Sequence, residues 1–342
     1  MNKSRGFASD NQAGVHPEVM DALAAANAGH AAAYGADPWT ARMQERFREH
    51  LGDAAHAFPV FNGTGANVLC VEALTQPWEG VVCARSAHLN VDECGAPERA
   101  GRKLLVLDTP DGRLTPDVVA PLLVRIGDEH VVQPRVVSIT QSTELGTVYA
   151  PDAIAALAEW AHAHGLLLHV DGARLCNAAA ALGVPLRALT TDAGVDALSF
   201  GGTKNGTMGA EAVVLLREAV ADGFRYRRKR AMQLASKMRF ISAQLDALLD
   251  GDLWLRSAAH ANAMARRLAD AVGGLDGVRI TQPVEANAVF AVLAPEATER
   301  LQRDWPFYVW DEGTGEVRWM TAWDTPPEDV DAFAAGVRAA LS

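Results

Sequence analysis

The segment PDAIAALAEWAHAHGLLLHVDGAR, residues 151–174, is the stretch that decides the fold class of this chain. Its first fifteen residues combine Pro near the start, apolar residues at helical spacing and Gly at the end, a pattern typical of a complete amphipathic helix. The apolar run 166–171 that follows is typical of a strand buried on both faces, and it ends in a carboxylate, Asp171. A helix that leads directly into such a strand indicates an α/β architecture.

Similar units lie on both sides of this segment, so we predict a largely parallel sheet covered by helices on both faces. Helical patterns precede and follow the apolar runs, for example at 64–76 and 116–126. The other runs expected to form strands of this sheet are 57–61, 81–84, 103–108, 135–140, 196–202 and 212–216.

After residue 217 the pattern changes from α/β to α+β. A long basic, Ala-rich helical region with a bend is expected over 218–249, and a second helix over 253–272. Short strands at 278–281, 288–293 and 317–323, a helix at 296–304 and a closing helix complete the chain. Because 342 residues suggest two domains, we predict a large domain over 1–250 and a small one over 251–342.

Composition excludes several classes of function. The chain has 31 Lys+Arg against 42 Asp+Glu, a net charge of −11, which argues against a protein that binds the nucleic-acid backbone. Residues 1–14 hold no apolar core of signal-peptide length, and no run approaches the ~18 apolar residues of a membrane span, so we expect a cytoplasmic protein. Four cysteines show neither CxxC nor His-paired metal spacing, so we expect no metal site and four buried thiols: Cys70, Cys83, Cys94 and Cys176.

Only five of the 31 basic residues are lysines, so a reactive amine has few candidates. Lys229 and Lys237 are expected on wet surfaces. Lys204 instead lies in the glycine-rich turn SFGGTKNG (199–206), directly after the predicted strand 196–202. A loop lysine is most simply a surface residue, but a desolvated lysine with a lowered pKa is the usual Schiff-base former.

Two further features follow predicted strands. The turn NGTGAN (62–67) either simply starts a helix or binds a phosphate at the helix start. It is not a Walker loop, because it lacks the lysine, and it is not a dinucleotide fingerprint, because Val68 replaces the third glycine. Asp171 is either a helix N-cap or a fixed anion that faces a ligand. Ligands of parallel sheets bind at the carboxyl ends of strands. A phosphate turn, an acid and a lysine at such ends together fit pyridoxal 5'-phosphate.

With these motifs the sequence resembles the threonine aldolases, which are fold-type I pyridoxal-phosphate enzymes, over nearly its whole length. The Asp-Gly-Ala-Arg segment and its spacing to the lysine are the most specific part of the resemblance. The matching stretches are Ser9-Asp10, YGADP (34–38), NGTGAN (62–67), Ala87-His88 with Glu93, HVDGAR (169–174), Lys204 and Val317-Arg318-Trp319.

The resemblance implies which residues bind the cofactor. Lys204 would form the covalent bond, and Asp171 would pair with the ring nitrogen. His88 would stack on the ring and help to transfer protons. Gly63, Thr64 and Gly65 would bind the phosphate, and Arg174 would also contribute to the cofactor site.

The resemblance also implies how the substrate and a second subunit contribute. Ser9, Arg174 and Arg318 would hold the substrate carboxylate, which suits the bidentate geometry of guanidinium. Family members are homotetramers, dimers of dimers with shared active sites. The run RYRRKR (225–230) is most simply a solvated helix face, yet Arg228 could reach the phosphate of a neighbouring subunit.

Two departures from the family pattern concern the substrate side. Where many members have a histidine that handles the substrate hydroxyl, this chain has Glu144. The frequent Val-Thr-His after the carboxylate arginine is replaced by Met-Thr-Ala (320–322). These changes question threonine itself as the preferred substrate and favour the branch that includes phenylserine aldolases.

We therefore predict an aldolase that cleaves L-β-hydroxy-α-amino acids by a retro-aldol reaction to glycine and an aldehyde. His88, Glu144 or a water that they position would accept the hydroxyl proton. The main alternative is another fold-type I enzyme, a β-eliminating lyase or an aminotransferase. A nucleotide-dependent oxidoreductase is disfavoured by the missing third glycine, and a non-catalytic binding protein would leave Lys204 and Asp171 unexplained.

Overall fold

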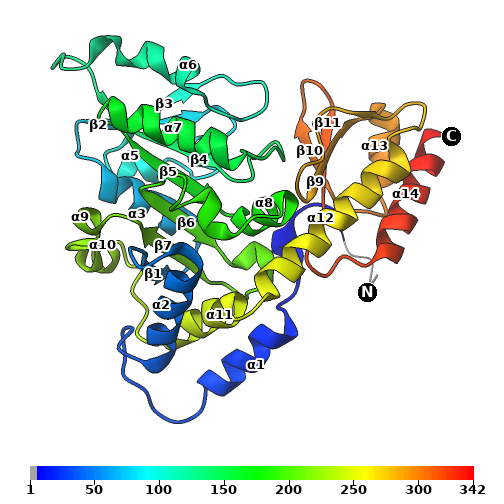
Figure 1. Cartoon of the computed structure of the whole chain (residues 1–342). Coiled ribbons are helices and arrows are strands. Elements are labelled where there is room, and N and C mark those ends of the chain that lie inside the picture. Colours follow the sequence, from blue (N-terminus) through cyan, green and yellow to red (C-terminus); the bar gives the residue numbers. More distant parts are fainter. Residues whose placement is uncertain (1–5) are drawn as a thin grey trace.

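A seven-stranded sheet forms the centre of the larger of two structural units in the computed structural model, which describes residues 6–342 (Figure 1). The strand order is β1-β7-β6-β5-β4-β2-β3. Only β7 runs against its neighbours, so the prediction of a mostly parallel sheet is confirmed. The strands are β1 (His56–Val60), β2 (Glu79–Ala84), β3 (Lys103–Leu107), β4 (Gln133–Thr140), β5 (Leu167–Gly172), β6 (Ala197–Gly201) and β7 (Glu211–Leu215).

Both faces of this sheet are buried, because successive residues of each strand contribute to different cores. In β5, Leu167 packs with the core under helices α3 (Gly63–Leu74) and α10 (Phe224–Arg230). The next residue, Leu168, packs on the opposite face with the core under a larger set of helices. This set includes α2 (Pro38–Leu51), α7 (Pro151–Ala163), α8 (Leu175–Leu182), α11 (Arg239–Leu249) and the start of α12 (Leu253–Val272).

Two predicted helices differ in the structure. The segment 116–126 forms one α-helical turn, α6 (Pro116–Val119), followed by the 3-10 helix η2 (Ala120–Arg125). The region 218–249 forms α9 (Glu218–Ala221), α10 and α11 instead of one bent helix, because left-handed residues at Gly223 and Met232 interrupt it. Short elements not predicted include α1 (Pro17–Ala26), α4 (His88–Val91), α5 (Ala96–Arg99), η1 (Asp10–Gln12), η3 (Leu186–Leu189) and η4 (Thr203–Asn205).

The smaller unit is built on a four-stranded antiparallel sheet in the order β10-β11-β9-β8. Its strands are β8 (Arg279–Ile280), β9 (Ala288–Val292), β10 (Tyr308–Asp311), which was not predicted, and β11 (Glu316–Met320). Its helices are α12 (Leu253–Val272), α13 (Pro295–Gln302) and α14 (Pro327–Leu341). Figure 1 shows α12 running from beside α11 to the small sheet, and the predicted boundary near residue 250 falls between these two helices.

The N-terminal segment packs on the smaller unit although it precedes the larger one in sequence. The backbone N–H of Phe7 donates to the carbonyl of Pro306 (2.8 Å), and its own carbonyl accepts from the N–H of Met320 (2.8 Å). The Phe7 ring is buried and stacks on Phe333 with 4.3 Å between centroids. Because Phe7 is anchored here, Ser9 and Asp10, which follow Ala8, lie at the junction between the two units.

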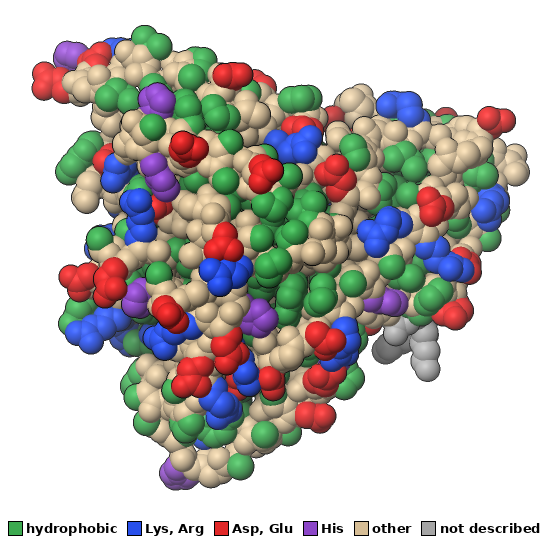
Figure 2. Space-filling model, in the orientation of Figure 1, with side chains coloured by type: hydrophobic (Ala, Val, Ile, Leu, Met, Phe, Trp, Pro, Cys, Tyr) green, Lys and Arg blue, Asp and Glu red, His purple; other side chains and the backbone are tan. Residues whose placement is uncertain are grey.

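The surface agrees with the charge balance of the sequence. Figure 2 shows acidic and basic side chains intermingled over the visible face rather than separated into patches of one sign. Within residues 6–342, no helix has the length and apolar character needed to cross a membrane. The prediction of four buried thiols is wrong for Cys94, which lies exposed in the turn between α4 and α5.

Candidate functional site

A cavity of about 400 Å³ opens at the carboxyl ends of β1, β5 and β6. It brings together five of the residues predicted from the sequence to bind the cofactor. Because the ends of neighbouring parallel strands share one edge of a sheet, features far apart in sequence converge here. The five residues are Gly63, Thr64, His88, Asp171 and Lys204.

Lys204 lies in η4, the single turn that follows β6. Burial lowers the pKa of its amine, and the positive charge of Arg174 lowers it further. Glu211, at the start of β7, lines the same cavity, and burial raises its pKa to about 7. A lysine whose pKa is lowered in this way carries more of the neutral amine that acts as a nucleophile.

Asp171 is buried at the end of β5 and is held by two donors. Its Oδ1 accepts from the backbone N–H of Ala173 (3.0 Å), and its Oδ2 accepts from Nδ2 of Asn67 (2.8 Å). The N-cap of the next helix is Arg174, so Asp171 does not cap it. The structure therefore fits a fixed anion on the cavity wall.

Asn67 and Glu93 join Asp171 to His88 in one hydrogen-bonded network. Nδ2 of Asn67 also donates to Oε1 of Glu93 (3.0 Å), and the same oxygen contacts Nδ1 of His88 (2.8 Å). The hydrogen bond to Glu93 raises the pKa of His88. With Nδ1 donating to Glu93, Nε2 is the nitrogen left to accept a proton when the ring is neutral. Sequence reasoning gave neither Asn67 nor Glu93 a role, although both lie in stretches that match the family.

Glu144 lies next to His88. Its Oε1 accepts from the backbone N–H of His88 (2.7 Å) and from the hydroxyl of Thr140 (2.9 Å). Burial raises the pKa of this carboxyl to about 7, and the charge of Asp171 contributes. Near neutral pH the group can therefore both hold and release a proton.

The glycine turn opens helix α3, whose N-cap is Asn62. The Oδ1 of Asn62 accepts from the N–H of Gly65 (2.7 Å), so this N–H is used inside the turn. A Cβ at Gly63 would meet nothing within 4 Å, whereas one at Gly65 would come 2.6 Å from the side chain of Gln233. Gly63 and Thr64 thus leave space for an anion at a helix start, and Gly65 serves close packing. A buried lysine, a fixed carboxylate and this open helix start fit pyridoxal phosphate.

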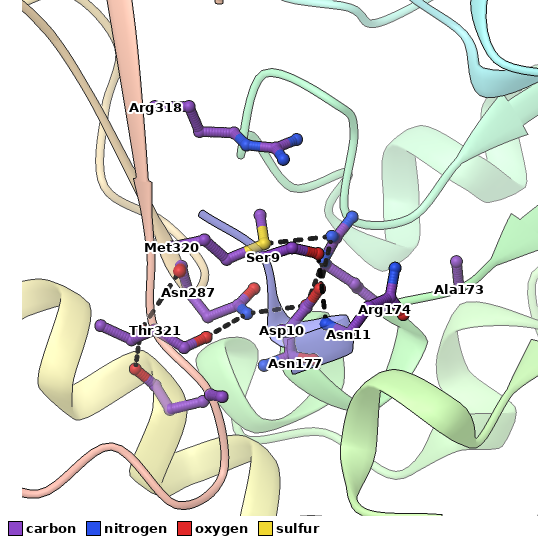
Figure 3. Close-up of polar contacts among 12 residues, drawn as sticks. Ser9, Asp10, Asn11, Ala173, Arg174, Asn177, Asn287, Arg318, Met320 and Thr321 are labelled. Carbon is purple, nitrogen blue, oxygen red and sulfur yellow. Dashed lines mark hydrogen bonds and ion pairs between the residues drawn. The ribbon is translucent and has the colours of Figure 1, made fainter. Parts of the chain in front are cut away.

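The predicted carboxylate-binding residues lie at the junction of the two units (Figure 3). Arg174 makes a bidentate ion pair with Asp10, from Nε to Oδ2 (2.7 Å) and from Nη2 to Oδ1 (2.9 Å). Arg318 donates to the carbonyl of Ala8 (3.2 Å), and its pKa is lowered to about 10 by burial and by the charge of Arg174. The hydroxyl of Ser9 accepts from the N–H of Asn11 (3.2 Å) and caps η1. The sequence predicts no role for Asp10, although Ser9-Asp10 matches the family.

Arg228 does not line this cavity. It is buried in α10, where Nη1 donates to the carbonyl of Pro59 (3.2 Å) and burial lowers its pKa to about 10. The prediction of a solvated helix face holds for Arg225, Lys229 and Arg230, which are exposed, but not for Arg228.

Comparisons with known proteins give a consistent result. The family model described as Beta-eliminating lyase matches residues 6–296. A protein of Pseudomonas sp. named "Low specificity L-threonine aldolase" is 45% identical over 100% of this chain and 99% of its own length. A protein of the same name from Pseudomonas aeruginosa is 47% identical over 97% of this chain and 96% of its own length. The solved structure of Leishmania major threonine aldolase superposes with a TM-score of 0.93 at 28% identity, over 98% of this chain and 99% of that one.

Proposed function

Because this chain belongs to the Beta-eliminating lyase family and to its threonine aldolases, which are pyridoxal-phosphate-dependent lyases, we propose that it cleaves L-β-hydroxy-α-amino acids, L-threonine among them, to glycine and an aldehyde. The observation that carries the proposal is the cavity in which the buried amine of Lys204 is brought together with the fixed carboxylate of Asp171. Gly63 lines the same cavity at a helix start, and a Cβ added there would meet no atom of residues 6–342 within 4 Å.

We propose that four residues hold the cofactor within this chain. Lys204 binds it covalently, Asp171 pairs with its ring nitrogen, and Gly63 and Thr64 bind its phosphate. When bound, pyridoxal phosphate supplies an electron sink for the pair released from the Cα–Cβ bond. Asn67 and the N–H of Ala173 keep Asp171 in place, so its charge is fixed before the reaction begins.

Arg174 and Arg318 bind the substrate carboxylate in this proposal. Both arginines are partly buried, which strengthens their hydrogen bonds to an anion. Holding the carboxylate fixes the orientation of the bonds at Cα, which determines the bond that breaks.

His88 accepts the proton of the β-hydroxyl through Nε2. Loss of this proton lets the hydroxyl oxygen form the carbonyl of the aldehyde while the Cα–Cβ bond breaks. Glu93 orients the ring through Nδ1 and stabilises the charged imidazolium, and Glu144 fixes the backbone of His88. The proton is finally returned to Cα, so glycine and the aldehyde together contain all the atoms of the substrate.

We propose a substrate range that extends to L-allo-threonine and L-phenylserine. The name of the two Pseudomonas relatives records low specificity. Glu144 takes the place of the histidine expected on the hydroxyl side, and its carboxyl is partly neutral near pH 7. A neutral carboxyl costs less free energy beside an apolar β-substituent than a charged one does.

The test is glycine release from L-threonine, L-allo-threonine, L-phenylserine and 3-hydroxyaspartate, with the aldehyde measured in parallel. Equal amounts of glycine and aldehyde are expected from the first three, and neither product is expected with Lys204→Ala. Pyruvate and ammonia instead of glycine would show a β-eliminating lyase, and dependence on a keto acid would show an aminotransferase. Full turnover by Lys204→Ala would remove the basis of the proposal.

We also propose that the protein works as a homo-oligomer, a dimer of dimers, in which Arg228 contributes to the cofactor phosphate site of a neighbouring copy. Arg228 lies outside the cavity of its own chain, and its Nε has no hydrogen-bond partner among residues 6–342. The test is to mix two inactive variants, Lys204→Ala and Arg228→Ala, and reassemble them. Mixed oligomers recover part of the activity if Arg228 acts across the interface, and stay inactive if it acts only within its own chain.

A further inference from the structure

We propose that Asp10 is a positioning residue for substrate binding: it holds the guanidinium of Arg174 so that Nη1 is presented to the substrate carboxylate. The inference rests on the proposed function, because it names how the carboxylate subsite of that reaction is built. Asp10 itself touches neither the substrate nor the cofactor in this proposal.

The geometry of the ion pair divides the donors of Arg174 into two groups. Nε and Nη2 are directed to the two oxygens of Asp10, and Nη2 also contacts Sδ of Met320 (3.1 Å). Nη1 has no hydrogen-bond partner within residues 6–342. It is also not fully buried, so it can be reached from solvent. One edge of the planar guanidinium is therefore occupied by Asp10, and a donor on the other side remains for an anion.

Asp10 is itself fixed from the smaller unit. Asn287 donates through Nδ2 to Oδ2 of Asp10 (3.1 Å) and to the carbonyl of Thr321 (2.8 Å), as Figure 3 shows. Asp10 and Asn287 are each only 1% exposed. Arg174 belongs to the larger unit, Asn287 and Thr321 belong to the smaller one, and Asp10 comes from the N-terminal segment. The direction of Arg174, in the larger unit, is therefore set by contacts from the N-terminal segment and from the smaller unit.

The charges of the subsite lead to the same assignment. Arg174 and Arg318 are two partly buried cations, and the charge of Arg174 adds to burial in lowering the pKa of Arg318. Asp10 compensates Arg174, which leaves the guanidinium of Arg318 without a carboxylate partner of its own among residues 6–342. Without Asp10, two guanidinium groups would repel each other across an empty subsite.

Asp10→Asn, which removes the charge of Asp10, distinguishes two roles for this residue. Charge compensation alone and positioning of Arg174 predict opposite changes in substrate binding. If Asp10 only weakened the positive field, Asp10→Asn would leave Arg174 more attractive, and substrates with a carboxylate would bind more tightly. If Asp10 positions Arg174, the variant loses one acceptor and places an amide N–H₂ against a guanidinium donor. Arg174 then turns away, and binding weakens despite the more positive field.

The experiment compares glycine with methylamine, which lacks only the carboxylate, as ligands of the holoenzyme of Asp10→Asn, followed by visible absorbance. We expect the Kd of glycine to rise about tenfold or more, the loss of about one hydrogen bond between charged groups, while the Kd of methylamine stays within about threefold. The KM of L-threonine rises in parallel with a smaller change in kcat. Asp331→Asn is the matched control, because Asp331 makes a bidentate pair with Arg267 (2.7 Å for both bonds) on the surface of the smaller unit. We expect this control variant to leave the Kd values of glycine and methylamine unchanged.

Tighter or unchanged binding of glycine to Asp10→Asn overturns the inference, and so does an equal rise for both ligands. Asn287→Ala gives an independent test, since it removes one donor to Asp10 but keeps the ion pair. It should raise the Kd of glycine by about threefold without changing that of methylamine, and no change would count against the inference. A wild type that binds glycine but cleaves none of the hydroxy amino acids would refute the proposed function and leave this test in force.

Discussion

Replacement of Glu144 by Gln should make the protein more stable at alkaline pH and leave its stability at acidic pH almost unchanged. Gln keeps the shape of the side chain, and its Oε1 can still accept from the N–H of His88 and the hydroxyl of Thr140. The change therefore removes the charge of a buried carboxyl and retains its hydrogen bonds.

The magnitude follows from the pKa. Burial and the charge of Asp171 raise the pKa of Glu144 from 4.5 to about 7. The folded chain thus binds more protons than the unfolded chain between these values, so stability falls as pH rises through this window. A shift of about 2.5 units at 1.36 kcal/mol each costs the wild type about 3 kcal/mol above pH 7. With about 2.1 cal/mol/K per residue over 342 residues, this corresponds to about 4 °C in Tm.

The assay is thermal unfolding of the holoprotein at pH 5 and pH 8, for the wild type, Glu144→Gln and Glu49→Gln. Glu49 is 57% exposed and controls for the loss of one negative charge. The advantage of Glu144→Gln over the wild type should appear at pH 8 and vanish at pH 5. If the advantage is equal at both pH values, or absent at pH 8, the carboxyl is not the buried, proton-binding group that the structure describes.

Three further predictions concern the cavity. Glu211→Gln should likewise stabilise the protein by about 3 kcal/mol at pH 8 and not at pH 5, because burial raises the pKa of Glu211 from 4.5 to about 7; urea denaturation at both pH values checks this. Glu93→Gln removes the negative charge beside His88 and weakens the hydrogen bond that raises the pKa of His88, so the rise of kcat/KM with pH should move to lower pH and its plateau should fall about tenfold or more, as a pH–rate profile would show. Asp171→Asn should lower kcat at least about 100-fold while the protein still folds, since Asn can accept from Asn67; steady-state kinetics and circular dichroism test the two parts.

The convergence of the proposed cofactor residues could be predicted from the sequence because it depends on one rule of sheet geometry. Gly63, Asp171 and Lys204 each follow or end a strand of the same sheet, so their strands bring them to one edge. The hydrogen bonds of Asn67 could not be predicted, because they depend on the rotation of α3 above that edge. The three-way division of the region 218–249 was also missed, since left-handed Met232 has no signature in a sequence rich in helix formers.

The carboxylate side depends on contacts that no local pattern encodes. Asp10 and Arg174 are 164 residues apart, and they meet because Phe7 is anchored in the core of the smaller unit. Arg318 reaches the same place from β11 of that unit. In this chain, then, the residues proposed to bind the cofactor lie at the edge of one sheet, whereas those proposed to bind and orient the carboxylate come from both units and the N-terminal segment. A substrate carboxylate bound between Arg174 and Arg318 would therefore bridge the two units.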